Sequence, residues 1–290
     1  MPDLKDKIEK ILQTTNDIDG RLKSLLEEYD QEYEQLKTAG LSLLSCRKQS
    51  VQLIESVQAL VNSIAKTPKS FKTAFETIEA SKQHFKDSQE YGKQQFADFS
   101  KSMVGAGVGA VGGIAVAKTS ESVMMWVATT FGRTASHKAI RGLSGAAAKR
   151  AALAWLGRGA VAAGGGGMAA GTALIEFLSG PFGWGIAGVS LVASLLSAWK
   201  KSVKIKEEKA KQILILMDCI SDTKRLRLKQ NALKKKTYQV RLLVKKAYSQ
   251  CCPYKSGNYL SFSEDTKNQL GALVNNTKSL SALLAESIKY

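Results

Sequence analysis

Two long stretches without charge constrain this 290-residue chain more than any other feature. Residues 159–175 and 177–199 contain no ionisable side chain, and Glu176 alone separates them. A helix that crosses the hydrocarbon layer of a bilayer needs about 20 apolar residues. Residues 179–183 include a Gly-Pro pair, which is typical of a turn. The sequence therefore predicts a central, glycine-rich, apolar helical hairpin that acts at a membrane.

The predicted hairpin combines small residues for helix packing with large apolar residues for lipid contact. Glycines spaced three or four apart share one face of a helix and let two backbones approach closely. Tryptophan favours the lipid–water interface, although core packing explains the tryptophans equally well. The predicted packing glycines are Gly105, Gly109, Gly113, Gly164, Gly167 and Gly171, and the predicted hairpin residues are Trp155, Met168, Leu174, Pro181, Phe182, Trp184, Leu191, Leu195 and Trp199.

The formal net charge of +17 is concentrated after the apolar stretches. Residues 1–102 have a net charge of −1, residues 103–199 of +5, and residues 200–290 of +13. A basic segment beside an apolar one is typical of chains that bind anionic surfaces. The predicted contacts to anionic lipid headgroups are Lys200, Lys201, Lys204, Lys206, Lys234, Lys235, Lys236, Lys245 and Lys246.

The remaining periodicity predicts an all-α fold with long amphipathic or coiled-coil helices on both sides of the hairpin. Residues 3–37 follow a heptad in which Glu32 occupies one apolar position. A second helix is expected over 41–66, a third after Pro68, and a last one that begins with a Ser261–Glu264 capping box. We expect three consecutive regions: a helical coiled-coil region (1–102), an apolar membrane-active region (103–199) and a basic helical region (200–290).

Catalysis is not indicated. His84 and His137 stand alone, and the four cysteines lack the spacing of a zinc site. The glycine run at 164–167 lacks the Lys-Ser/Thr of a phosphate-binding loop. We expect no enzymatic activity, no cofactor, no metal and no small-molecule substrate. The amino terminus has no signal-peptide pattern, so cytoplasmic synthesis is expected, with membrane association in the active state.

Residues 143–174 resemble a glycine-zipper segment of uncharacterised bacterial proteins, in the pattern LSGAAA…LAWLG…AAGGGGMA. The likeness covers about 32 residues and implies no activity. Lys149, Arg150 and Arg158 depart from the pattern, since the family often has small or polar residues there. In architecture, long helices around an apolar hairpin are similar to α-helical pore-forming toxins and to apolipoprotein L-like proteins, by fold-level analogy.

These features favour a membrane-active effector or toxin that inserts the hairpin and assembles as a homo-oligomer or with a helical partner protein. One alternative is a constitutive membrane-anchored coiled-coil scaffold or adaptor. Another is a soluble helical bundle whose glycine-rich middle forms its core. Nucleic-acid binding is disfavoured because the basic region lacks interleaved aromatic residues and any base-reading motif.

Overall fold

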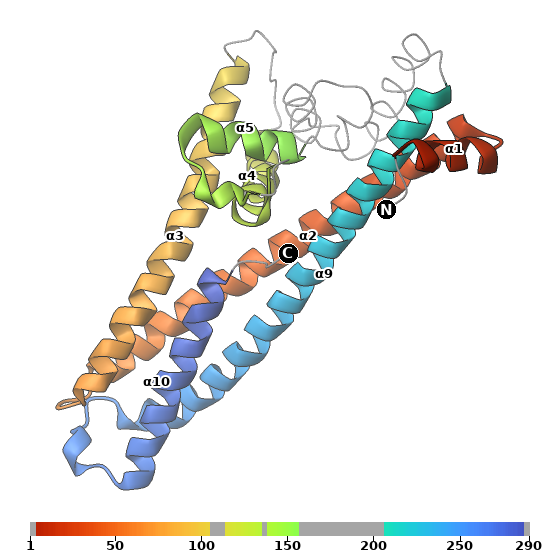
Figure 1. Cartoon of the computed structure of the whole chain (residues 1–290). Helices are drawn as coiled ribbons and strands as arrows, with labels where there is room; N and C mark the ends of the chain where they lie inside the picture. Colours follow the sequence, from red (N-terminus) through yellow and green to blue (C-terminus); the bar gives the residue numbers. More distant parts are fainter. Residues whose placement is uncertain (1–3, 105–113, 135–137, 157–205, 287–290) are drawn as a thin grey trace. The chain divides into compact units, whose positions relative to one another are not determined.

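The computed structural model describes residues 4–104, 114–134, 138–156 and 206–286. These residues form helices and no β-strand, with two isolated bridges, which confirms the all-α class. In chain order the elements are α1 (Leu4–Thr14), α2 (Ile18–Asn62), α3 (Lys69–Val104), α4 (Ile114–Phe131), η1 (Ile140–Gly142), α5 (Gly145–Leu156), α9 (Lys206–Cys251), η2 (Cys252–Tyr254), η3 (Tyr259–Ser261) and α10 (Glu264–Ala285) (Figure 1).

The chain divides into two compact units built from separated segments. Unit 1 comprises Met1–Gly40 and Tyr91–Arg227, and unit 2 comprises Leu41–Glu90 and Leu228–Tyr290. The helices α2, α3 and α9 each contribute one part to unit 1 and another part to unit 2. The three consecutive regions expected from the sequence stay a prediction.

The first helical break lies earlier than the sequence suggests. The break expected between residues 37 and 41 is absent, because α2 runs from Ile18 to Asn62. The chain is interrupted instead between α1 and α2, where Asp17 accepts a 2.9 Å hydrogen bond from the backbone N–H of Gly20. A carboxylate at this position satisfies a helix N-terminus that would otherwise lack a partner. A Cβ on Gly20 would overlap that carboxylate, so glycine fits the cap.

Unit 2 is an arrangement of four helical segments from α2, α3, α9 and α10. The hairpins α2–α3 and α9–α10 are joined at their turns, where Ala65 donates to the Gly257 carbonyl and accepts from the Tyr259 N–H, both at 2.9 Å. The α2 and α9 segments therefore run in the same direction, with α3 and α10 returning (Figure 1). Apolar residues at helical spacing in these segments are buried: Leu44, Val51, Ile54, Val57, Val61, Ile64, Phe71, Phe75, Ile78, Phe85, Leu270, Leu273, Leu280 and Leu284.

In unit 1, the part of α4 from residue 123 to residue 129 is enclosed over its whole circumference. Every residue from 123 to 129 is buried, and Trp126 makes an edge-on contact with the ring of Phe131. A Cβ on Gly92 of α3 would lie 3.1 Å from the Cα of Trp126, so glycine allows the two helices to approach closely. η1 and α5 also pack against α4. An apolar helix that is buried on all sides is typical of an internal core element.

Ion pairs join α2 to α9 in unit 1. Glu32, the charged residue in the predicted heptad, accepts two hydrogen bonds from Arg227, at 2.9 and 3.3 Å. Both side chains are largely shielded from solvent, at 12% and 17% exposure. Lys209 pairs with Asp19 at 2.7 Å. Asp19 and Glu32 pair with Lys209 and Arg227 in the same order along the chain, so the two segments run parallel. Glu32, the charged residue in the apolar heptad, therefore contacts another helix.

Two local predictions are wrong. The helix α10 is capped by Ser263, whose hydroxyl accepts from the Thr266 N–H, whereas Ser261 lies in η3. The spacing of Ile213, Met217 and Ile220 predicts one apolar stripe of a helix, yet Met217 is 44% exposed while the other two are buried. Position 217 lies four residues after 213 and three before 220, so it shares their side of α9, and its exposure places it at the edge of the packed surface.

Candidate anionic-surface interface

The part of α9 in unit 2 has a buried side and an exposed side. Leu233, Thr237, Val244 and Cys251 recur at heptad intervals and are buried among the other helices of the unit. The residues turned away from this side are exposed and include lysines, large apolar residues and uncharged polar residues. We call this surface the outer face of α9, formed by Lys235, Tyr238, Leu242, Leu243, Lys245 and Lys246.

Positive charge on the outer face is uncompensated. Lys235, Lys245 and Lys246 form no ion pair with any described residue, and the half-buried Lys234 beside them forms none either. Residues 223–263 contain eleven lysines and arginines and no aspartate or glutamate. At the edge of the face, Lys236 pairs with Glu286 at 3.3 Å. A basic segment without acidic residues has no acidic groups of its own to pair with, and its positive charge attracts an anionic surface.

Large apolar side chains share the face with the lysines. Tyr238 is 45% exposed, Leu242 46% and Leu243 57%. Tyr238 and Leu242 lie four residues apart and therefore one above the other on the helix. Exposed apolar side chains that occur singly need no explanation, but a contiguous set marks an interaction surface.

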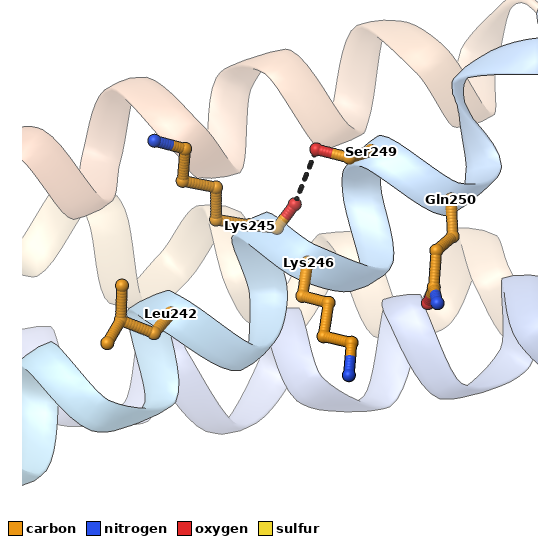
Figure 2. Close-up of a pocket in the computed structure, with 5 residues that line it drawn as sticks. All are labelled: Leu242, Lys245, Lys246, Ser249 and Gln250. Atoms are coloured by element: carbon orange, nitrogen blue, oxygen red, sulfur yellow. Dashed lines mark hydrogen bonds between the residues drawn. The ribbon is translucent and has the colours of Figure 1, made fainter.

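A shallow hollow of about 480 Å³ lies along the carboxyl-terminal half of the outer face. Leu242, Lys245, Lys246, Ser249 and Gln250 line it, all from α9 (Figure 2). The Ser249 hydroxyl donates to the backbone carbonyl of Lys245 at 3.1 Å, which holds the hydroxyl against the helix backbone. The hollow offers two ammonium groups beside an apolar side chain.

The helix that carries this face is fixed by polar contacts inside unit 2. Arg47 of α2 is 1% exposed and donates to the backbone carbonyl of Glu286 at 2.7 Å. Burial lowers the pKa of the Arg47 guanidinium to about 10, while Glu286 opposes that shift. Arg47 therefore stays charged at neutral pH. The Glu286 carboxylate in turn accepts from Lys236, which links α2, the end of α10 and α9.

The other predicted site residues are distributed as follows. Trp155 lies half-buried on α5 of unit 1. Lys206 begins α9. The structure thus brings together Lys234, Lys235, Lys236, Lys245 and Lys246 on one stretch of α9 and places Trp155 in the other unit. Outside the described residues lie Gly105, Gly109, Gly113, Gly164, Gly167, Gly171, Met168, Leu174, Pro181, Phe182, Trp184, Leu191, Leu195, Trp199, Lys200, Lys201 and Lys204.

Sequence reasoning missed the apolar members of this surface. Tyr238, Leu242 and Leu243 were not among the predicted lipid contacts. The signal was present, because positions 235, 238, 242 and 246 recur at helical spacing opposite the buried positions 237 and 244. What the sequence did not reveal is which side of this basic helix packs against the rest of the unit.

Comparison of the chain with protein-family models, with curated proteins and with solved structures gave no match. Over the part of the chain that the structure describes, none of the helices has both the length and the apolar content required to cross a membrane. The same residues contain no group of three or more His, Cys, Asp or Glu side chains placed to hold a metal ion. Among the described residues, the outer face of α9 combines unpaired lysines with exposed apolar side chains.

Proposed function

We propose that this protein is a membrane-active helical protein that docks on anionic bilayers through the outer face of α9. The observation that carries the proposal is the set of unpaired lysines, interleaved with exposed Tyr238 and leucines, in a stretch without acidic residues. A lysine near an anionic membrane surface contributes about 1 kcal/mol. Three such lysines together favour binding by roughly 150-fold.

In this proposal docking is followed by insertion of the uncharged runs 159–175 and 177–199 as a helical hairpin. The glycines at 105, 109, 113, 164, 167 and 171 provide helix–helix contacts in the bilayer, and several copies assemble. The long amphipathic helices supply coiled-coil packing around the hairpin. Support for this step comes from the length of the uncharged runs and from the likeness to glycine-zipper proteins. The outcome is a pore-forming or membrane-perturbing effector.

Binding and leakage of vesicles test the proposal in two stages. The full-length protein is added to dye-loaded vesicles of phosphatidylcholine alone and of phosphatidylcholine with phosphatidylglycerol. We expect co-sedimentation and dye release with the anionic vesicles, both weakened by salt because surface charges are screened. Neither binding nor release at low salt would overturn the proposal.

A substitution in the apolar run separates insertion from docking. Leu191→Arg with Leu195→Arg places two charges where the hairpin is expected to enter lipid, at a cost of about 3 kcal/mol for each arginine. We expect this variant to bind anionic vesicles like the wild type and to release no dye. Binding without release by the wild-type protein itself would instead favour the membrane-anchored scaffold.

A further inference from the structure

The apolar side chains on the outer face of α9 are placed where they can enter a bilayer surface. Tyr238 and Leu242 point outward on consecutive turns, and Leu243, the next residue, is exposed about 100° further round the helix. None of the three belongs to the buried heptad positions of α9. The three side chains are therefore surface residues of unit 2, and their exposure does not disrupt its core.

The lysines surround this apolar centre. Lys235 lies one turn before Tyr238, and Lys245 and Lys246 lie one turn after Leu242. Lysine can keep its ammonium group in the polar layer while its methylene stem lies along apolar surface. Lys245, Lys246 and Leu242 all line the hollow, although the two lysine side chains extend in different directions from the helix (Figure 2).

The ring of Tyr238 is supported from the α2 side of the unit. Its centroid lies 5.2 Å from the guanidinium carbon of Arg241, within the range of a cation–π contact. Arg241 in turn donates to the side-chain carbonyl of Gln49 on α2. Tyrosine presents an apolar ring and a polar hydroxyl, the combination that favours the boundary between headgroups and acyl chains.

We propose that α9 lies in the interfacial layer of an anionic phospholipid bilayer, with Tyr238, Leu242 and Leu243 between the headgroups and with Lys235, Lys245 and Lys246 on their phosphates. This inference rests on the proposed function and specifies its mode of binding. Charge complementarity selects the occupant, since the face has uncompensated lysines and its segment has no acid. An inserted apolar centre makes part of the affinity independent of salt, whereas lysine contacts alone would be lost on screening.

Two pairs of leucine substitutions in the full chain test this mode. The test variant is Leu242→Ala with Leu243→Ala. The matched control is Leu41→Ala with Leu260→Ala, two leucines of unit 2 that are 39% and 63% exposed and lie outside α9. Binding to phosphatidylcholine–phosphatidylglycerol vesicles is measured at about 50 mM and about 500 mM NaCl, with the Debye length falling from about 14 Å to about 4 Å. A duplex DNA of matched charge is titrated in parallel, and thermal melting checks that every variant is folded.

We expect the test variant to lose about 30-fold in vesicle affinity at high salt, and the control to bind like the wild type. Equal binding by the test variant and the wild type at both salts would overturn the insertion while leaving electrostatic docking intact. Absence of wild-type binding to any vesicle would overturn the proposed function itself. Tight binding of DNA with no binding of vesicles would overturn both and assign the lysines to a nucleic acid.

Discussion

The two parts of α9 use positive charge differently. In unit 1, Arg227 and Lys209 are paired with Glu32 and Asp19 of α2, so their charge holds two helices together. In unit 2, the lysines of the outer face have no acidic partner among the described residues and stand beside exposed apolar side chains. The same residue types therefore serve packing in one unit and remain available for a partner in the other. Net charge alone, without the positions of the acids, does not distinguish these roles.

The largest effect is expected from neutralising the outer face. Changing Lys235, Lys245 and Lys246 to Gln removes three contacts worth about 1 kcal/mol each, so affinity for anionic vesicles should fall roughly 150-fold with thermal stability unchanged. Vesicle co-sedimentation at low salt measures this loss. The matched control changes Lys23, Lys72 and Lys278 to Gln, three exposed lysines on α2, α3 and α10. Equal losses in the two variants would mean that total charge, and not the outer face, governs binding.

Substitutions in the ion-paired part of α9 in unit 1 should change the free energy of unfolding. Arg227→Leu leaves the largely buried carboxylate of Glu32 without its partner, which costs about 2–3 kcal/mol of unfolding free energy. Adding Glu32→Leu should recover most of this loss, because position 32 belongs to the apolar heptad. Chemical denaturation of the two variants provides the measurement. A single variant as stable as the wild type would show that the pair is dispensable for packing.

The acidic residue Asp30 in unit 1 is expected to make the stability of the fold depend on pH. Burial, with a further contribution from Glu34, raises the pKa of Asp30 from 3.8 to about 6. The Asp30 carboxyl therefore binds a proton more tightly in the folded protein than in the unfolded chain. Ionised Asp30 lowers the free energy of unfolding above pH 6, and this penalty disappears as the pH falls toward 4. Asp30→Asn should stabilise unit 1 by about 0.5–1 kcal/mol at pH 7.5, a value reduced for solvent screening, and by almost nothing at pH 4. Thermal melting at both values tests this, and a gain that is independent of pH would contradict it.

The smallest effect on vesicle binding concerns the ion pair between Lys236 and Glu286 at the edge of the outer face. Glu286→Gln releases Lys236, which is paired with that carboxylate at 3.3 Å. One freed lysine should tighten binding to anionic vesicles about fivefold. The Arg47 contact to the backbone carbonyl of Glu286 is retained, so α10 should stay in place. Weaker vesicle binding by this variant would show that Glu286 orders the face rather than neutralising it.

Apolar periodicity and a proline start are local signals, and they predicted that the chain folds into long helices. The buried residues from Phe71 to Phe85 and the start of α3 after Pro68 are examples. The first break was predicted wrongly, since it lies between α1 and α2. Cap chemistry was less visible: Asp17 and Ser263 each begin a helix through a single side-chain contact, and several nearby residues could have served.

The sequence could not predict which side chains from distant segments contact each other. Nothing near Glu32 in the chain reveals that Arg227, 195 residues away, occupies the space beside it. For the same reason the sequence identified the lysines of α9 without showing that Leu242 and Leu243 share their exposed side. Which face of a basic helix is free depends on the helices that cover the other face, and these come from elsewhere in the chain.

Site-specific photo-crosslinking to lipid tests the central claim most directly. A benzophenone side chain is placed at Leu242 on the outer face of α9 or at Lys278, an exposed position on α10 of the same unit. Each full-length protein is irradiated with anionic vesicles that contain a labelled phospholipid. We expect strong labelling from position 242 and background labelling from position 278. Equal labelling, or labelling from position 278 alone, would contradict the assignment of the outer face of α9 as the membrane-binding surface.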